Sequence, residues 1–132
     1  MNEMPTPTPR ELEILKVLWE DGPSSVRAVH RRLLLREPDL AYNTVQTLLR
    51  LMDDKNLVRH ELEGRTFIYT ARFTRDESTA RFLDRVFDGA ASQLVQSLLQ
   101  SERVSAAELE RIQALIDAAR RKNGRRQGER SA

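Results

Sequence analysis

Apolar side chains recur every three or four positions through the first part of the chain, which predicts amphipathic helices. The first helix is expected to begin at a capping box, in which Thr8 is the cap and Glu11 is its partner. Gly22 offers a left-handed end to that helix, and Pro38 terminates the second one. The three helices of this part are expected over about residues 9–21, 25–37 and 40–56.

After the third helix, apolar side chains recur at a shorter period. Residues 57–62 alternate loosely between apolar and polar side chains, and residues 66–69 are β-branched or aromatic, so both runs are expected to be strands. The segment Glu63-Gly64-Arg65 between them has the composition of a hairpin turn. Helical spacing then returns, with further helices expected over residues 75–88, around residues 94–99 and from Ser105 onward.

The order of these elements predicts a fold class that is mainly α with a small β-hairpin. Helix, helix, helix and hairpin is the order of a winged helix-turn-helix, so residues 6–73 are expected to form a winged-helix DNA-binding domain. Residues 74–122 are expected to form a C-terminal helical dimerisation domain. Residues 123–132 are rich in Gly, Arg, Gln and Ser, and they are expected to form a basic, disordered tail.

The apolar stripes of the chain need a partner, because short helices provide only a thin core and small isolated domains are marginally stable. Burial against a second copy is the simplest solution, and a dimer with C₂ symmetry is the most common form of it. We therefore expect a homodimer. Its contact face is expected to consist of Phe82, Val86, Phe87, Leu94, Leu98, Leu109, Ile112, Leu115 and Ile116.

The third helix carries the most informative polar face in the chain. Its apolar side chains fall on one side, whereas amides, hydroxyls and one guanidinium fall on the other. Such groups can both donate to and accept from base edges in a DNA major groove. A solvated face usually carries Glu and Lys, so the Asn and Thr found here favour base contact. The residues expected to contact DNA are Tyr42, Asn43, Thr44, Gln46, Thr47 and Arg50, together with Arg65 at the hairpin tip.

Other interpretations of these features stay open. The polar side of the third helix, the arginine in the turn and the arginines of the second helix are each compatible with an ordinary solvated surface. For the whole chain, two other classes are compatible with the sequence. One is a winged-helix protein–protein interaction module without DNA contact, and the other is a regulator that senses a small molecule in its helical half.

Composition excludes several classes of protein. The chain contains no cysteine, which excludes disulfides, thiol catalysis and thiolate metal sites. Its two histidines, His30 and His60, lack the convergent ligands that a metal requires, so both are interpreted as unrelated surface residues. The sequence also shows no nucleophile–base pair or phosphate-binding loop. We therefore expect no enzyme activity, no cofactor and no metal.

Charge and hydropathy change this interpretation little. Lys and Arg number 22 against 20 Asp and Glu, and most of this small excess lies in residues 120–126. That basic stretch is equally compatible with DNA binding and with a solubilising role. No apolar run reaches the roughly 18 residues that cross a membrane, and residues 1–9 do not resemble a signal peptide. A cytoplasmic protein without membrane insertion is expected.

Three stretches of the sequence, read together, resemble the penicillinase and methicillin-resistance repressor family of the BlaI/MecI type. They are LAYNTVQTLLR at residues 40–50, KNLV at residues 55–58 and GRTFIY at residues 64–69. The opening ELEILKVLW at residues 11–19 is similar to the first helix of that family. The resemblance extends over about residues 6–120 and is strongest in the first half of the chain.

The resemblance implies a homodimeric winged-helix repressor that acts in an antibiotic response. Such repressors bind pseudo-palindromic operators of the TACA/TGTA kind and dimerise through their C-terminal helices. In studied members a membrane sensor-protease responds to β-lactams and triggers cleavage in the dimerisation region, so repression ends when the dimer is weakened or cleaved. Another branch senses copper through C-terminal cysteines, a route that this chain lacks because it has no cysteine.

The sequence departs from the family at positions that bear on specificity and induction. Leu51 stands where a second arginine is frequent, and Asn56 stands where glycine is frequent. Asn43 and Gln46 occupy positions that are basic in the best-known members, so the operator sequence stays open. The Asn-Phe pair that is cleaved in those members is absent near residues 97–98, so the inducer and the cleavage site stay open as well.

Overall fold

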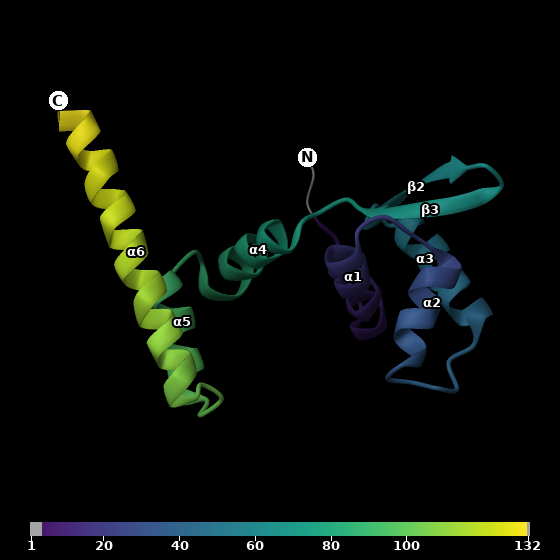
Figure 1. Cartoon of the computed structure of the whole chain (residues 1–132), viewed down its shortest axis with the longest axis horizontal. Coiled ribbons are helices and arrows are strands. Elements are labelled where there is room, and N and C mark those ends of the chain that lie inside the picture. The colour runs from purple at the N-terminus through teal and green to yellow at the C-terminus, as the bar shows by residue number, and fades with distance from the viewer. Residues whose placement is uncertain (1–3, 132) are drawn as a thin grey trace. The chain divides into compact units, whose positions relative to one another are not determined.

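The computed structural model describes residues 4–131, and its elements follow the expected order with one addition (Figure 1). The first part contains the helices α1 (Pro9–Asp21), α2 (Val26–Leu34) and α3 (Tyr42–Asp54) and the strands β1 (Ser24–Ser25), β2 (Val58–Glu63) and β3 (Thr66–Ala71). It is followed by the helices α4 (Arg75–Phe87), α5 (Ala91–Gln100) and α6 (Ala106–Ser131). The chain divides into two compact units, Met1–Arg85 and Val86–Ala132.

Side-chain caps begin the first two helices, and the cap of the first is the capping box that the sequence predicted. At the start of α1, the amide of Glu11 donates to Thr8 Oγ1 at 3.2 Å, and the amide of Thr8 donates to Glu11 Oε1 at 2.8 Å. This reciprocal pair is a complete capping box. Ser25 caps α2 by accepting a hydrogen bond from the amide of Ala28 at 3.1 Å. These caps provide hydrogen-bond acceptors for amide groups that have no partner within the helix.

The sheet contains one strand more than the sequence predicted. It is antiparallel with the order β1-β3-β2, and β1 pairs with β3 through Ser24 opposite Tyr69 and Ser25 opposite Ile68. A strand of two residues is too short to show an alternating pattern. It could therefore not be read from its own sequence, because its only defining feature is the pairing with β3.

Two left-handed backbone positions set the path of the β2–β3 hairpin. Gly64, with φ of 67°, is the first central residue of a tight turn that is closed by the pairing of Glu63 with Thr66. Asn56 adopts φ of 65° shortly before β2. Asparagine tolerates this region better than most residues other than glycine, which explains why it fits a position where the BlaI/MecI type often has glycine.

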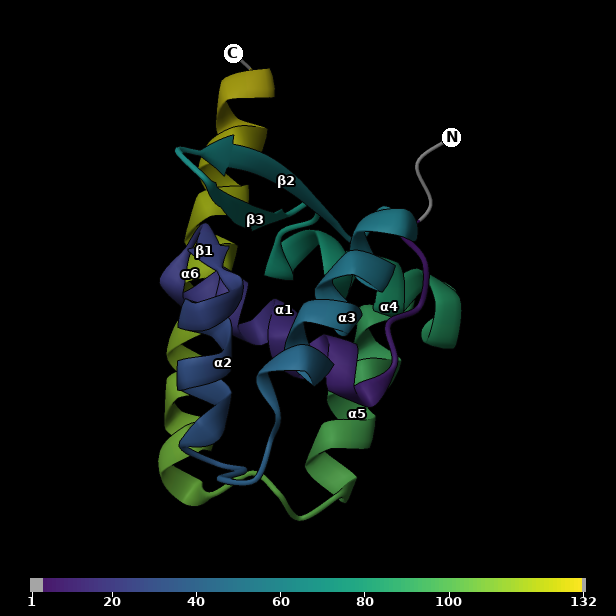
Figure 2. The same ribbon diagram turned by 90° about the vertical axis from the view of Figure 1, so that its right-hand side faces the viewer.

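The core of the first unit lies where α1, α2, α3 and the base of the hairpin meet (Figure 2). In α1, Ile14 and Leu18 are buried in the core, whereas Leu12 and Trp19 are only half-buried. The side chains with the least exposure are Ile14, Leu15, Val29, Val45, Leu49, Met52, Leu57 and Val58.

The first unit ends later than the expected domain boundary at Phe73. It extends through Arg85, so most of α4 belongs to the same unit as the winged helix. The indole Nε1–H of Trp19 donates to the carbonyl oxygen of Phe73 at 2.7 Å, and Arg85 donates to Thr6 Oγ1. These contacts join residues that lie far apart in the sequence, and a pattern of local spacing does not reveal them.

The second unit consists of helices whose side chains are largely exposed. α5 contains no buried residue, and α6 contains none up to Gly128. α6 also continues through residues 123–131, where the sequence predicted disorder. Arg, Lys and Gln are good helix formers, and here their propensity outweighs Gly124 and Gly128, each of which disfavours a helix by about 1 kcal/mol relative to Ala.

Candidate nucleic-acid interface

The helix α3 turns its apolar side into the core and its polar side outward. Val45, Leu49 and Met52 are each 0% exposed and belong to the main hydrophobic cluster. The other face consists of exposed side chains, and it includes all six residues of this helix that were expected to contact DNA: Tyr42, Asn43, Thr44, Gln46, Thr47 and Arg50. α3 therefore has the two faces that the sequence predicted.

The exposed side of α3 presents a row of hydrogen-bonding groups. Asn43, Thr47 and Arg50 follow one another at spacings of four and three residues, so their side chains lie along one line of the helix. Gln46 and Thr44 lie on opposite flanks of that line. The row carries one formal charge, on Arg50, and otherwise offers neutral donors and acceptors.

The N-terminal end of α3 is open to a ligand. Its cap residue is Ala41, and no side chain caps the helix there. Amide groups at an uncapped helix terminus are left to bond solvent or an anion, and the helix dipole favours negative charge at this end. Tyr42, the first residue of α3, is 42% exposed beside these amides. A DNA phosphate would be well accommodated at this position.

His30 of α2 holds the start of α3 in place. Its Nε2–H donates to the carbonyl oxygen of Leu40 at 2.7 Å, since a carbonyl oxygen can only accept. The imidazole ring also meets the ring of Tyr42 edge-on, with the centroids 5.6 Å apart. His30 was interpreted from the sequence as an unrelated surface residue. The structure instead gives it contacts on both sides of the point where α3 begins.

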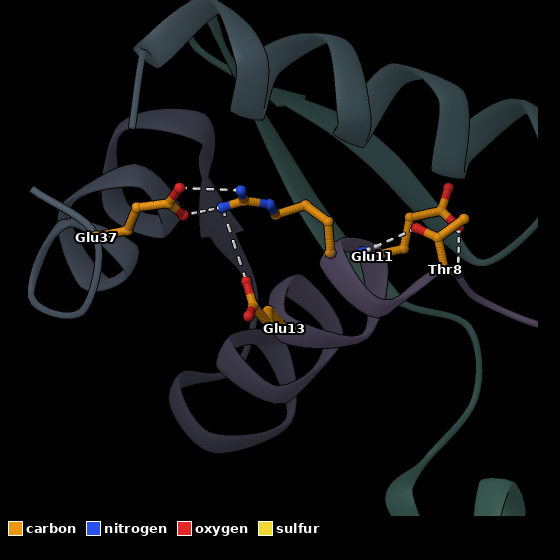
Figure 3. Close-up of polar contacts among 5 residues, drawn as sticks. Thr8, Glu11, Glu13 and Glu37 are labelled. Atoms are coloured by element: carbon orange, nitrogen blue, oxygen red, sulfur yellow. Dashed lines mark hydrogen bonds and ion pairs between the residues drawn. The ribbon is translucent and has the colours of Figure 1, made fainter. Parts of the chain in front are cut away.

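The segment between α2 and α3 is tied to α1 by an ion pair (Figure 3). Arg10 Nη2 donates to Glu37 Oε1 at 3.0 Å, and Arg10 Nη1 donates to the second carboxylate oxygen. Glu13 Oε2 lies 3.8 Å from the same Nη1 atom. The hydrogen bond from the guanidinium lowers the pKa of Glu37 and raises the pKa of Arg10. Because exposed pairs contribute little to stability, we assign this pair the role of orienting the segment that leads into α3.

A buried carboxylate links α1 to the residue after α3. Lys55 Nζ lies 3.1 Å and 3.0 Å from the two carboxylate oxygens of Glu11, which also accepts from the amide of Thr8. Burial by itself raises the pKa of Glu11, but the hydrogen bonds from the Thr8 amide and from the Lys55 ammonium outweigh it, so the pKa lies below its ordinary value. Glu11 is therefore ionised in the folded protein at neutral pH.

Replacing Glu11 by glutamine is expected to lower the free energy of unfolding at neutral pH by about 1–3 kcal/mol, because charge-assisted hydrogen bonds are weakened. A carboxyl group whose pKa is lowered by folding stabilises the fold above its unfolded pKa, and this contribution is lost as the pH falls through the folded pKa. The difference between the wild type and Glu11→Gln should therefore shrink below about pH 4.3. Urea unfolding as a function of pH measures it.

The control for this prediction is Glu13→Gln, on the same helix but at an exposed position. It should change the free energy of unfolding by no more than about 0.5 kcal/mol. A difference between the wild type and Glu11→Gln that stayed constant from neutral to acidic pH would contradict the role assigned to the carboxylate.

The β2–β3 hairpin forms the wing, and Arg65 is exposed in its turn. The wing is joined to α3 by His60 of β2, whose Nδ1 contacts Asp53 Oδ2 near the end of α3. The His60 ring also packs against Phe67, with centroids 4.7 Å apart, and against Tyr69, with centroids 5.9 Å apart. Burial, followed by the charge of Asp53, raises the pKa of Tyr69. These contacts hold the base of the wing against α3, so the two proposed DNA-contacting elements are positioned together.

Two exposed apolar features of α3 and the wing were not predicted to belong to the interface. Leu51 is 47% exposed and lies one turn beyond Thr47 on the same face of α3. Its spacing of four residues from Thr47 could have marked it. Leu62 and Phe67 form an exposed cross-strand pair next to the turn. That pair depends on the strand register, which the turn sets, so spacing alone did not identify it.

The residues expected at a dimer contact are only partly shielded. Val95 and Leu99 of α5, which were not among them, are exposed as well. The helices α4, α5 and α6 of a single chain therefore each present apolar side chains to solvent. Of the expected residues, Phe87, Leu94 and Ile112 are half-buried, and the exposed ones are Phe82, Val86, Leu98, Leu109, Leu115 and Ile116.

Metal-ligand clusters are absent from the part of the chain that the structure describes, in which no three His, Asp or Glu side chains gather as a metal ion would require. Over residues 4–131, no helix has both the length and the apolar character needed to cross a membrane.

Comparison with known proteins identifies the family of the chain. The family described as Penicillinase repressor matches residues 7–118. The penicillinase repressor of Bacillus licheniformis is 25% identical over 121 residues, which cover 89% of this chain and 94% of that protein. The transcriptional regulator BlaI of Mycobacterium tuberculosis is 39% identical over 71 residues, which cover 53% of this chain and 51% of that protein.

A solved structure agrees with the fold. The solution structure of the DNA-binding domain of the repressor BlaI matches with a TM-score of 0.51 and 28% identity, and the match covers 58% of this chain and 93% of that one. The expected winged helix-turn-helix is thereby confirmed, and the relatives are transcription regulators, not enzymes. Because the family match extends over most of the sequence, this chain belongs to the penicillinase repressor family.

Proposed function

We propose that this protein is a transcriptional repressor that binds double-stranded DNA as a homodimer, with α3 of each subunit in a major groove of a pseudo-palindromic operator. The observation that carries the proposal is the exposed row Asn43, Thr47 and Arg50 on a helix whose opposite side is fully buried. An amide side chain can pair with adenine, a threonine methyl can meet a thymine methyl, and an arginine can reach guanine or a phosphate. The relatives named as repressors support the same function.

The contacts around α3 favour reading of base sequence, because direct readout needs a helix held in a fixed orientation. His30 anchors the loop before α3, and the Glu11–Lys55 pair anchors the residue after it. His60 connects its last turn to the wing. The helix is therefore fixed at both ends, while the polar side chains between them are exposed.

Dimerisation is supported by the apolar side chains that a single chain leaves exposed. α4 and α5 contain no buried residue, although both carry Leu, Val or Phe at helical spacing. A second copy is the partner that fits these faces, since symmetric dimers are the most common oligomers. Two α3 helices in one dimer would then read two half-sites of an operator.

Release of the operator follows, in this proposal, from loss of the dimer in the cytoplasm. Once one subunit is bound, binding by the second is effectively intramolecular, which can raise avidity by roughly 10²–10⁴. Any event that separates the subunits removes this gain. Cleavage triggered by a membrane sensor-protease is one such event. This chain lacks the Asn-Phe pair near residues 97–98, so the proposal depends on dimer loss and not on cleavage at a particular bond.

Selection from a random pool of DNA duplexes tests the proposed function and yields the operator at the same time. Full-length protein should enrich an inverted repeat of two half-sites, with centres about 34–36 Å apart or a multiple of this distance. The enriched duplex should be bound far more tightly than random DNA at physiological salt. Failure to enrich any sequence would overturn the proposal and favour the protein–protein interaction module.

Arg65→Ala is expected to weaken binding to every duplex by a similar factor if Arg65 contacts a phosphate, because a phosphate contact carries no sequence information. The slope of log affinity against log salt concentration should become shallower by about one, since one phosphate contact is lost. Fluorescence anisotropy at several salt concentrations measures both effects. Arg103→Ala, at an exposed position between α5 and α6, is the matched control. An unchanged salt slope in Arg65→Ala would remove the wing from the proposed interface.

A further inference from the structure

The end of α6 carries a concentration of positive charge that the proposed operator contact does not use. Five cations lie within seven residues: Arg120, Arg121, Lys122, Arg125 and Arg126. The next acidic residue along the chain is Glu129, and Arg130 follows it directly, so the two add no net charge. Every side chain from position 120 to position 128 is exposed. This end of the helix is therefore strongly basic and fully accessible.

Most of this charge lies on one side of α6, which is a single continuous helix through this segment (Figure 1). A helix turns by about 100° per residue, so side chains at positions i, i+1, i+4 and i+5 fall on one side of it. Four of the cations have this spacing, and we call them the basic strip: Arg121, Lys122, Arg125 and Arg126. The opposite side holds Arg120, Asn123 and Gln127, and thus one cation only.

The stability of the helix does not account for the basic strip. The strip contains two pairs of like charges four residues apart, an arrangement that destabilises a helix. The helix dipole favours cations only within the last turn, whereas α6 continues to Ser131. Asp117, four residues before Arg121, accepts a hydrogen bond from Gln113 Nε2 at 3.0 Å. A ligand of opposite charge would relieve the repulsion within the strip.

The lack of apolar side chains beside the strip indicates the class of this ligand. The apolar positions of α6 end at Ala119, and no aliphatic or aromatic side chain follows over residues 120–131. A helix that binds a membrane surface buries an apolar face in it, and this segment has none. The backbone of duplex DNA requires only cations, because it carries one negative charge per about 1.7 Å of its axis. The strip therefore fits DNA better than it fits a membrane.

We propose that the basic strip of α6 binds the phosphate backbone of duplex DNA without reading its base sequence. Lysine and arginine that neutralise phosphates release the counterions condensed on DNA, which favours binding at low salt whatever the sequence. The strip thereby raises the affinity for the operator and for random DNA by the same factor. It is a second contact, separate from α3 and the wing, and it does not depend on whether α3 reads an operator.

The test is a full-length variant that combines Arg121→Gln, Lys122→Gln, Arg125→Gln and Arg126→Gln. Glutamine is a good helix former, so α6 is retained. On a random duplex, the slope of log affinity against log salt concentration is expected to become shallower by about 3–4, since each lost phosphate contact removes about 0.9. Affinity at low salt should fall roughly tenfold or more. Fluorescence anisotropy at several salt concentrations measures both effects.

The matched control removes the same number of charges at exposed positions elsewhere: Lys16→Gln, Arg31→Gln, Arg36→Gln and Arg103→Gln. It should change the slope by less than about one. Within α6, Arg125→Gln should reduce the slope by about one, whereas Arg120→Gln, on the opposite side, should leave it nearly unchanged. Equal effects of the two fourfold variants would attribute the loss to net charge and overturn the proposal. An unchanged slope in the basic-strip variant would overturn it as well.

Two further measurements separate the basic strip from operator reading and from membrane binding. The ratio of operator affinity to random-DNA affinity should be the same in the wild type and in the basic-strip variant, and a lower ratio in the variant would contradict a sequence-independent contact. A wild type that binds all duplexes equally would overturn operator reading by α3 and leave the strip in place. If the variant keeps the wild-type salt slope but no longer sediments with vesicles of phosphatidylserine and phosphatidylcholine, the strip binds a membrane surface and the proposal is wrong.

Discussion

Leu115→Asp in the full-length protein is expected to reduce affinity for a complete operator by roughly 10²–10⁴, while affinity for an isolated half-site stays within about threefold. Leu115 is 70% exposed on α6, so a polar replacement leaves the fold of a single chain nearly unchanged. In the proposed dimer the same replacement would bury an unpaired carboxylate, which is strongly unfavourable. Fluorescence anisotropy on whole and half operators measures the two affinities, and sedimentation measures the oligomeric state.

The matched control is Ala114→Asp, which adds the same charge to the neighbouring position on a different side of α6. It should remain dimeric and bind the complete operator normally. Two results would contradict the proposal in different ways. A Leu115→Asp protein that stays dimeric would place the contact elsewhere, and a monomeric one that still binds the whole operator tightly would remove the avidity argument.

The second large effect is expected on the exposed row of α3. Asn43→Ala and Thr47→Ala should each weaken binding to the selected operator by about 1–3 kcal/mol, because each would remove the proposed contact with a base edge. The loss should concentrate on one or two base pairs, so that an operator changed at those pairs binds the wild type and the variant almost equally. Affinities for a set of single-base operator variants measure this pattern.

Thr79→Ala on α4 controls for the loss of an exposed helical threonine outside the proposed interface. It should leave both affinity and base preference unchanged. Loss of binding by the same factor for every sequence, in Asn43→Ala and Thr47→Ala alike, would argue against direct readout. The row would then contribute only to general affinity, and specificity would have to come from DNA shape.

The fold of the first unit was largely predictable, because its signals are local. The capping box of Thr8 and Glu11 lies within one helical turn, and Gly64 marks the hairpin turn by its own conformational preference. The division of α3 into two faces follows from helical spacing alone. By contrast, β1 and the extension of the first unit to Arg85 depend on pairing between distant segments. Such contacts leave no periodic trace in the sequence.

The candidate site, too, was predictable from the sequence only in part. Spacing identified the exposed residues of α3, but it did not show what holds the helix. His30 reaches the carbonyl oxygen of Leu40 from α2, and His60 reaches Asp53 from β2. From the sequence both histidines were interpreted as unrelated surface residues. Their roles come from neighbours that only the folded chain brings to them.

The sequence by itself determined the helices, the hairpin and the two faces of α3, because propensity, capping and periodicity act over a few residues. Only the tertiary structure decided how α3 is anchored and where the first unit ends. The buried Glu11 shows the physical reason. Its cap to Thr8 is three residues away and predictable, whereas its partner Lys55 lies 44 positions further along and meets it only through packing.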